Sequence, residues 1–311
     1  MERVAAVIVG PTCSGKTKLA LAISDKVNSE IISADSRQIF KLLNIGTAKP
    51  SKQELHSVKH HFIDLLNPDE EFNVSKFEKE SLKIIEDLFQ TDKLPIVVGG
   101  SGLYIKTLID GIIDVPDTDP NFRKELLEIR KEKGNEFLYE MLKSIDKQSA
   151  DSMLPQNWKR VIRAIEIYKT TNQKFSDIKN KNIRTTDFQF MQFGLLWNRQ
   201  ELYDNIEKRV DEMIEMGLVE EVEKILVAGF SPALNSLNTV GYKEIINYLN
   251  KEISFEKAIE FIKRNTRRYA KRQMTWFNKD KRIMWIEVDN QSSFEKIADE
   301  ILYDIKTQEY L

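Results

Sequence analysis

The sequence has little sulfur and few imidazoles. It contains one cysteine, Cys13, and three histidines among 311 residues. A single cysteine excludes internal disulfides and a zinc site built of thiolates, and it suits a reducing cytoplasm. The histidines, His56, His60 and His61, lie close together without a cysteine or an acid at ligand spacing. They therefore do not predict a metal centre.

Long apolar runs are also absent. No stretch approaches the roughly 20 apolar residues that a membrane span needs. The apolar run at the N-terminus is short and leads into a glycine loop rather than a cleavage site, so we expect no signal peptide. An excess of one charge is missing too, because 47 Lys and Arg stand against 49 Asp and Glu. This balance argues against a uniformly basic nucleic-acid binder but allows a local basic patch.

The sequence does contain an alternation of strand and helix patterns. Short apolar runs predict buried strands at residues 4–9, 31–34, 61–66 and 95–98. Apolar residues recur with helical spacing between them, at 18–27 and 74–89. Strands that alternate with helices in this way predict an α/β fold with a parallel sheet and right-handed crossovers.

The pattern changes near residue 114. A turn-rich linker is predicted by a cluster of acids and prolines: Asp114, Pro116, Asp117, Asp119 and Pro120. Residues 121–170 are then almost wholly helical in pattern and highly charged, and 188–197 returns to a strand. We therefore expect an all-helical insertion at 115–187 within an α/β core formed by 1–114 and 188–311.

The last part of the core is predicted to be mainly helical. The expected elements are helices at 199–227, 239–250 and 254–278, a strand at 282–288 and a final helix. We find no internal repeat and no low-complexity tract.

Residues 10–17, GPTCSGKT, match the phosphate-loop pattern G-x-x-x-x-G-K-[ST] between a predicted strand and a predicted helix. The glycines let backbone N–H groups turn toward a phosphate, and the helix N-terminus adds positive potential. Lys16 supplies a point charge, and the Thr17 hydroxyl can bind Mg²⁺. The loop therefore predicts a site for a diphosphate or triphosphate with Mg²⁺.

The acid that P-loop hydrolases place after an apolar strand is missing. The strand predicted at 95–98 runs into Gly-Gly-Ser-Gly without a carboxylate, which weakens a motor or ATPase interpretation. Asp35 instead follows the strand at 31–34, at the same sheet edge as the phosphate loop. It could serve as a helix cap held by Arg37. It could also act as a base that accepts a proton late, once an attacking nitrogen has become acidic.

A second charged feature is a basic helix. Nine Lys and Arg lie between residues 263 and 282, with Asp280 as the only acid. A stripe of one sign predicts polyanion binding. The opposite face is predicted to pack on the core, because its members are spaced by three and four: Ile259, Ile262, Thr266, Tyr269, Gln273 and Trp276. A smaller cluster in the insertion holds Lys159, Arg160 and Arg163 beside Trp158.

Taken together, these blocks resemble the tRNA dimethylallyltransferase family, also called tRNA isopentenyltransferase, in its bacterial type. The resemblance covers nearly the whole chain, through GPTCSGKT, ISADSRQIF, IGTAKP, HHFIDLLNPDE, VVGGSGLYIKTLIDG, QNWKRVIRAIEIY, LNTVGYKEI and RRYAKRQMTWF. It implies a P-loop nucleotide-kinase-like core that transfers a dimethylallyl group from dimethylallyl diphosphate to N6 of the adenosine 3′ of the anticodon. The loop would then grip the donor diphosphate rather than ATP, which explains the missing acid.

The resemblance also implies roles for single residues. Asp35 would be the general base, and Lys16 and Ser101 would act at the reacting centre, with Ser101 standing where the family usually has threonine. The implied diphosphate ligands are Gly10, Thr12, Cys13, Ser14, Gly15, Lys16, Thr17, Arg199 and Arg209, with Thr17 on Mg²⁺.

Contacts with the tRNA anticodon stem-loop are implied for residues in both predicted regions. These are Asp35, Ser36, Arg37, Gln38, Ser101, Arg123, Gln156, Asn157, Trp158, Lys159, Arg160, Arg163, Thr239, Gly241, Tyr242, Lys243, Arg268, Lys271, Arg272, Gln273 and Trp276.

Two departures from the family pattern matter. In the stretch R-x-x-L-x-x-R-I-x-x-R, Arg199, Leu202, Ile206 and Arg209 fit, but Asn205 replaces the middle arginine. No phosphate contact is therefore expected at that position. The zinc finger of eukaryotic members also has no counterpart here, in line with the few Cys and His residues.

Three alternatives stay open at this point. A small-molecule P-loop kinase would turn over ATP without tRNA, and an adenylate isopentenyltransferase would accept free AMP. A non-catalytic, nucleotide-dependent RNA-binding protein would keep its function without Asp35. We further expect a cytoplasmic monomer with no membrane association and no protein partner.

Overall fold

The computed structural model describes residues 3–112, 119–179 and 186–308. The chain divides into two compact units. One unit, called the core unit below, combines Met1–Ile109 with Thr186–Leu311, and the helical unit spans Asp110–Thr185. Each is described by itself.

The core unit is built on a six-stranded sheet in which every pairing is parallel, with strand order β3-β2-β4-β1-β5-β6. The strands are β1 (Arg3–Val9), β2 (Ile31–Ser33), β3 (His60–His61), β4 (Ile96–Gly99), β5 (Phe188–Trp197) and β6 (Ile283–Val288). Ala6 of β1 lies opposite Ile96 of β4 and Met191 of β5. The predicted α/β fold with a parallel sheet is confirmed.

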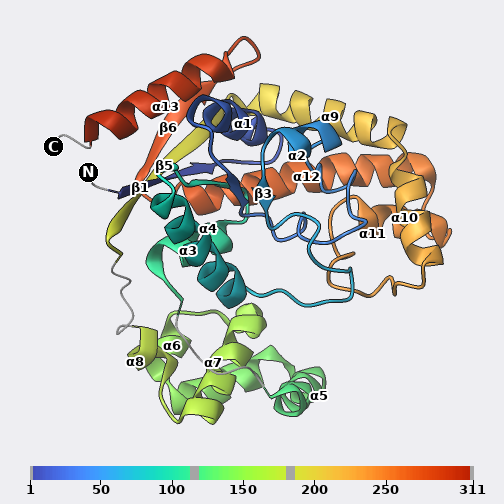
Figure 1. The fold of residues 1–311 in the computed structure, drawn as a ribbon. Helices are drawn as coiled ribbons and strands as arrows, with labels where there is room; N and C mark the ends of the chain where they lie inside the picture. Colours follow the sequence, from blue (N-terminus) through green and yellow to red (C-terminus); the bar gives the residue numbers. More distant parts are fainter. Residues whose placement is uncertain (1–2, 113–118, 180–185, 309–311) are drawn as a thin grey trace. The chain divides into compact units, whose positions relative to one another are not determined.

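Helices cover both faces of the sheet (Figure 1). Successive strand residues point to opposite faces, so Ala6 and Ile8 pack on one side and Val7 and Val9 on the other. The first side is covered by α1 (Lys16–Val27) and α13 (Phe294–Gln308). The second is covered by α3 (Val74–Gln90), α4 (Gly102–Asp110) and α12 (Phe255–Phe277). These helices bury the β-branched strands that the sequence showed as continuous apolar runs.

The strand predicted at 61–66 is wrong. Pairing stops at His61, because Phe62 and Asp64 adopt left-handed φ values of 63° and 54°. Leu66 forms an isolated parallel bridge with Phe40, outside the six strands of the sheet. Phe62 is nevertheless only 3% exposed. The apolar residues at 61–66 therefore indicate that the segment is buried, but not that its backbone is extended.

The long helix predicted at 199–227 consists of two helices, α9 (Arg199–Glu215) and α10 (Leu218–Val227). Gly217 separates them with a φ of 95°, a conformation that residues with a Cβ rarely adopt. The helix predicted at 239–250 begins later, as α11 (Tyr242–Leu249). The strands and helices predicted at 188–197, 254–278 and 282–288 are confirmed to within a residue. Two helices, α2 (Lys52–Ser57) and α4 (Gly102–Asp110), were not predicted.

The helical unit contains α5 (Pro120–Ile145), α6 (Lys147–Asp151), a 3₁₀ turn η1 (Pro155–Asn157), α7 (Trp158–Thr171) and α8 (Phe175–Lys179). It has its own core, with Leu126, Leu138 and Ile162 fully buried. Of the predicted linker, residues 114, 116 and 117 lie outside the described residues. Asp119 and Pro120 instead begin α5, where the Asp119 carboxylate accepts the N–H of Asn121 at 2.9 Å.

The three histidines are used separately. His56 and His60 bond to the backbone carbonyls of Lys52 and Val58, and His61 bonds to Glu30. Among the described residues, no group of three or more His, Cys, Asp and Glu is placed to hold a metal ion, and no helix is long and apolar enough to cross a membrane.

Candidate active site

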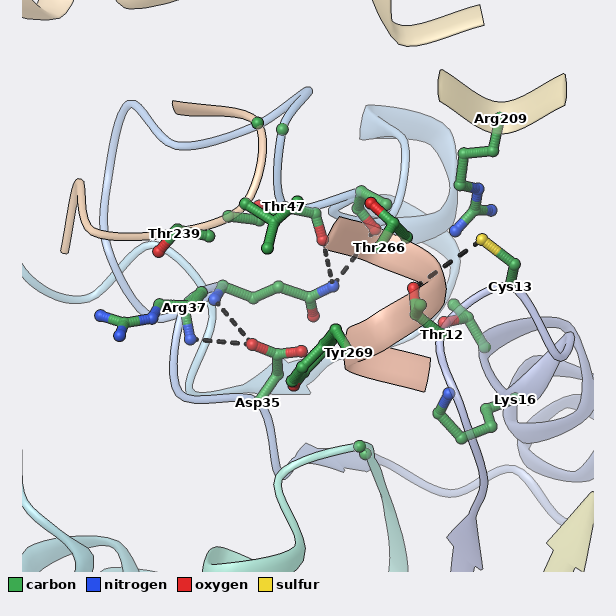
Figure 2. A pocket seen from close by; sticks show the side chains of 18 of the residues that line it. Thr12, Cys13, Lys16, Asp35, Arg37, Thr47, Arg209, Thr239, Thr266 and Tyr269 are labelled. Carbon is green, nitrogen blue, oxygen red and sulfur yellow. Dashed lines mark hydrogen bonds between the residues drawn. The ribbon is translucent and has the colours of Figure 1, made fainter. Parts of the chain in front are cut away.

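The carboxyl ends of the parallel strands open into a cavity of about 410 Å³ (Figure 2). Its wall is built from segments far apart in the sequence. These are the phosphate loop, the end of β2, residues 46–48 with Pro50, the end of β4, one face of α9, residues 238–241 with Lys243, and one face of α12.

The phosphate loop turns on two residues with left-handed φ values, Cys13 at 63° and Gly15 at 87°. Gly15 caps α1, so the positive end of that helix faces the cavity. The Lys16 ammonium donates to the Pro11 carbonyl at 2.5 Å. Burial lowers the pKa of Lys16 to about 8, an effect that Arg209 adds to and that Cys13 and Asp35 oppose. A bound diphosphate would supply negative charge that favours the protonated lysine.

Gln273 of α12 ties the phosphate loop to the end of β4. Its side-chain oxygen accepts the Thr12 N–H at 2.9 Å, and its nitrogen donates to the Gly100 carbonyl at 3.0 Å. Both ends of the amide are thus used inside the protein, and the side chain is 6% exposed. Gln273 was expected to bind tRNA, but the structure gives its side chain a role in shaping the loop.

Asp35 lies just beyond β2, and its two carboxylate oxygens differ in their hydrogen bonding. Its Oδ1 accepts the backbone N–H groups of Arg37 at 2.8 Å and Gln38 at 3.3 Å. Its Oδ2 accepts no hydrogen bond from a described residue. The Ser101 hydroxyl accepts the Ser36 N–H at 3.1 Å, so the structure brings these predicted residues together.

The side chains of Arg37 and Gln38 are also engaged within the protein. Arg37 donates to the Asn235 carbonyl at 2.7 Å. The Gln38 nitrogen donates to the Thr47 and Ala48 carbonyls at 3.2 and 3.1 Å. Both residues line the cavity as predicted for site residues, but the Gln38 amide nitrogen holds residues 47–48 rather than pointing freely outward.

The two arginines expected to bind the diphosphate are separated by the structure. Arg209 lines the cavity from α9 (Figure 2). Arg199 is exposed at the start of the same helix, where it donates to the Tyr203 hydroxyl at 3.2 Å and lies outside the described cavity lining. Asn205 lies outside the lining as well. Arg199 stays a predicted diphosphate ligand, but it stands ten residues before Arg209 on α9 and outside the described lining.

The stripe of one sign on α12 is partly neutralised by acids from α9. Lys263 pairs with Asp211 at 2.7 Å and Arg267 with Glu207 at 2.5 Å. The stripe was predicted to bind a polyanion. This prediction is corrected for Lys263 and Arg267, because acids of the protein already pair with them. Arg268, Lys271 and Arg272 border a shallow hollow and form no ion pair with a described residue. They remain predicted contacts with tRNA.

Other predicted tRNA contacts fall into two groups. Thr239, Gly241 and Lys243 line the cavity. Tyr242 is fully buried, with its hydroxyl donating to Glu221 at 2.6 Å, so the predicted contact of its side chain with tRNA is wrong. Trp276 is partly buried and packs against Gly102, which makes it mainly a core residue.

In the helical unit, the predicted tRNA residues gather around η1 and the first half of α7. Gln156, Asn157, Lys159 and Arg160 are exposed. The Trp158 ring lies 3.9 Å from the Arg130 guanidinium carbon. The remaining two, Arg123 and Arg163, flank the buried Glu166 at 3.5 and 3.8 Å.

Several residues of the cavity wall were not predicted as site residues, among them Thr47, Ala48, Met213, Thr266 and Tyr269. Thr266 and Tyr269 had been placed on the core-facing side of α12, and this side in fact faces partly into the cavity. Figure 2 shows Tyr269 beside the Asp35 carboxylate, and burial together with Asp35 raises the pKa of the tyrosine. Thr47 and Ala48 stand in the block IGTAKP, which was a signal for the site that went unused.

Known proteins resemble this chain along most of its length. A model of the IPP transferase family matches residues 38–280. The tRNA dimethylallyltransferase of Acetivibrio thermocellus is 47% identical over 304 residues, 97% of each chain. The tRNA isopentenylpyrophosphate transferase of Bacillus halodurans superposes with a TM-score of 0.72 at 35% identity, over 100% of this chain and 99% of that one.

A structure of a eukaryotic dimethylallyltransferase acting on tRNA is also similar, with a TM-score of 0.84 at 28% identity, over 98% of this chain and 79% of that chain. The matched sequence blocks, the parallel sheet and the full-length relatives all agree. The chain belongs to the IPP transferase family, the tRNA dimethylallyltransferases.

Proposed function

We propose that this protein transfers a dimethylallyl group from dimethylallyl diphosphate to N6 of the adenosine 3′ of the anticodon in tRNA, releasing diphosphate. The observation that carries the proposal is that the phosphate loop and the half-bonded Asp35 line one cavity. Donor and acceptor groups can therefore meet there. The names of the relatives support the same reaction.

Dimethylallyl diphosphate has a charged part and an apolar part, and the cavity likewise has a polar part and an apolar part. Lys16, Arg209 and the amides of the phosphate loop suit the diphosphate. The same face of α9 that carries Arg209 also presents Ile206, Val210 and Met213, and these side chains suit a short hydrocarbon chain.

Mg²⁺ is the cofactor that these residues fit. Mg²⁺ in phosphate sites takes one or two protein oxygens and completes its shell with phosphate oxygens and water. The Thr17 side chain lines the cavity and has no hydrogen-bond partner among the described residues, so its hydroxyl is available as a ligand. When bound, the ion would neutralise charge on the departing diphosphate.

Asp35 is proposed as the base. The N6 nitrogen attacks C1 of the dimethylallyl group while the C1–O bond breaks, and the electron pair of that bond leaves with the diphosphate. The nitrogen then sheds a proton, which passes to Asp35 Oδ2. Because Oδ1 is held by two backbone N–H groups, the carboxylate keeps its orientation while Oδ2 accepts the proton.

The tRNA is proposed to contact cations of both units. Adenosine beside the anticodon must leave its stack to reach Asp35, which costs a few kcal/mol. Tyr269 offers an aromatic ring next to the carboxylate, and stacking of a base on such a ring contributes about 1–3 kcal/mol. Phosphates would be held by the exposed cations of α7 and by Arg268, Lys271 and Arg272.

We further propose that the protein acts as a monomer in the cytoplasm. The exposed large apolar side chains come from different elements, such as Leu103 of α4 and Val227 of α10. The free thiol of Cys13 in the phosphate loop suits a reducing compartment.

Labelled dimethylallyl diphosphate, Mg²⁺ and unmodified tRNA with an adenosine beside the anticodon test the reaction. Asp35→Asn is the sharpest variant, because the amide oxygen still accepts the N–H groups of Arg37 and Gln38 while the basicity is lost. We expect single-turnover transfer to fall by about 10²–10⁴-fold, with tRNA binding unchanged. Asp25→Asn, an exposed acid on α1, is the matched control and should behave as the unaltered protein.

Transfer by Asp35→Asn at the unaltered rate would remove Asp35 as the base. Label entering free AMP but not tRNA would favour an adenylate isopentenyltransferase instead. Turnover of ATP without tRNA would favour a small-molecule kinase.

A further inference from the structure

Residues 44–48 form a loop on the cavity wall that is held by a carboxylate from a distant helix. The backbone N–H groups of Asn44, Ile45 and Gly46 all donate to Glu221 of α10, at 2.9–3.2 Å. Successive amides converge on a bound anion in the same way in phosphate-binding loops. Here the anion is the protein's own side chain, so the loop is held before any substrate arrives.

A second helix completes this arrangement. Tyr242, the first residue of α11, donates its hydroxyl to the same carboxylate at 2.6 Å. Its ring is fully buried and packs on Gly46 so closely that a Cβ there would lie 2.4 Å from a ring carbon. Glu221 therefore receives donors from four residues, and each bond is strengthened by the negative charge.

The other edge of the loop faces the proposed base. The carbonyls of Thr47 and Ala48 accept the two bonds from the Gln38 amide nitrogen (Figure 2). Gln38 in turn donates its backbone N–H to Asp35 Oδ1. An unbroken series of contacts thus runs from Tyr242 through Glu221, the loop and Gln38 to Asp35. Glu221 and Tyr242 do not themselves belong to the described cavity lining.

We propose that Glu221 is a positioning residue for Asp35, acting through the loop at 44–48 and Gln38. The inference rests on the proposed prenyl transfer. Asp35 must present one oxygen to the attacking nitrogen, and a displacement of about 1 Å at a reacting centre can cost 10²-fold in rate. When one of the two Glu221 oxygens is replaced by a donor, amides of the loop lose part of their acceptor, and we expect the carbonyls that hold Gln38 to move with them.

Glu221→Gln tests the inference. The amide keeps the volume but replaces one acceptor oxygen with a donor, which faces the loop amides. We expect the single-turnover transfer rate at saturating donor and tRNA to fall about 10–50-fold. The amplitude, which counts folded active enzyme, and the Kd for tRNA should change less than about twofold. Glu223→Gln, an exposed acid on the same helix, is the matched control and should leave the rate unchanged.

A double-mutant cycle separates positioning from a purely structural role. If Glu221 acts through Gln38, then Glu221→Gln adds little to the rate loss already caused by Gln38→Ala, because the path is already broken. Additive losses, or a fall in amplitude with no change in rate, would overturn the inference. Where Glu221→Gln does not fold, Tyr242→Phe keeps the ring on Gly46, removes one donor and should give a smaller rate loss of the same kind.

The unaltered protein distinguishes this failure from that of the proposed function. Transfer by the unaltered protein, together with an unchanged rate in Glu221→Gln, would refute the positioning role alone. Absence of transfer by the unaltered protein would refute the proposed function and the inference with it.

Discussion

Two glutamates, one in each unit, differ in how their carboxylates are hydrogen-bonded. Glu221 of the core unit accepts bonds from three backbone amides and a tyrosine hydroxyl. Glu166 of the helical unit is 1% exposed, yet neither of its oxygens accepts a hydrogen bond from a described residue. Its cationic neighbours Arg123 and Arg163 stay 3.5 and 3.8 Å away. The Glu221 carboxylate thus has its hydrogen bonds within the protein before any ligand binds. Arg123 and Arg163, in contrast, are attracted by the charge of Glu166 and donate no hydrogen bond to it.

This difference matters for what each unit can bind. The side chains of Arg123 and Arg163 are 44% and 38% exposed, so their N–H groups can still donate outward. A guanidinium group that lies near a buried carboxylate and keeps exposed N–H groups can bind a phosphate group. The core unit therefore carries a carboxylate fixed by hydrogen bonds, and the helical unit carries two partly exposed guanidinium groups that suit the proposed contact with tRNA phosphates. Four variants test this difference between the units, and the variant with the strongest expected effect comes first.

Lys16→Met should strongly reduce the rate of prenyl transfer without weakening the binding of tRNA. The Lys16 ammonium is the buried cation of the phosphate loop, and under the proposed function its removal would take away charge that stabilises the leaving diphosphate. We expect kcat/KM for the donor to fall about 10³-fold, while filter binding of tRNA stays unchanged. Lys83→Met, an exposed lysine on α3, serves as the control. A loss of tRNA affinity as large as the loss of rate would break the division between the units.

Arg123→Gln combined with Arg163→Gln should do the reverse. Under the proposed contact of these arginines with tRNA phosphates, removing both should cost on the order of 1–2 kcal/mol of tRNA affinity at moderate salt. We expect KM for tRNA to rise about 10-fold with kcat unchanged, and the salt dependence of binding to flatten. The matched pair is Lys131→Gln with Lys143→Gln, two exposed cations of the same unit. A fall in kcat with KM unchanged would contradict the assignment of these arginines to binding.

Glu166→Gln and Glu221→Gln should differ in their effect on stability. Burial raises the pKa of Glu166 against the pull of Arg123 and Arg163, so the ionised form is the costly one in the folded state. The stability linked to this carboxyl is present at low pH and is lost as the pH rises through its raised pKa. Replacing Glu166 by Gln should therefore leave the thermal midpoint equal or higher, with the gain growing as the pH rises.

Glu221→Gln should instead lower the midpoint, because it leaves loop amides without an acceptor at a cost of about 1–3 kcal/mol. Calorimetry between mildly acidic and neutral pH measures both variants. A midpoint that falls equally in the two would mean that Glu166 is as well bonded as Glu221.

Much of the fold followed from local sequence. The apolar runs of β1, β4 and β5 and the pattern of α12 predicted these elements because burial and periodicity act over a few residues. The phosphate loop was equally readable, since its glycines and its lysine stand at fixed spacing within eight residues. The run 61–66 misled because burial does not specify backbone conformation, and Phe62 is buried in a left-handed turn.

The parallel sheet, the helical pattern of residues 121–170, the phosphate loop and the position of Asp35 at the sheet edge could all be predicted from the amino-acid sequence. Which cations form ion pairs within the described part of the chain depends on how the chain folds. Asp211 and Glu207 neutralise Lys263 and Arg267 from more than fifty residues away. The tertiary structure also decided that Glu221 and Tyr242 hold the loop beside Gln38. The physical reason is that hydrogen bonds and ion pairs join atoms that folding brings together, and spacing along one helix or strand carries no record of them.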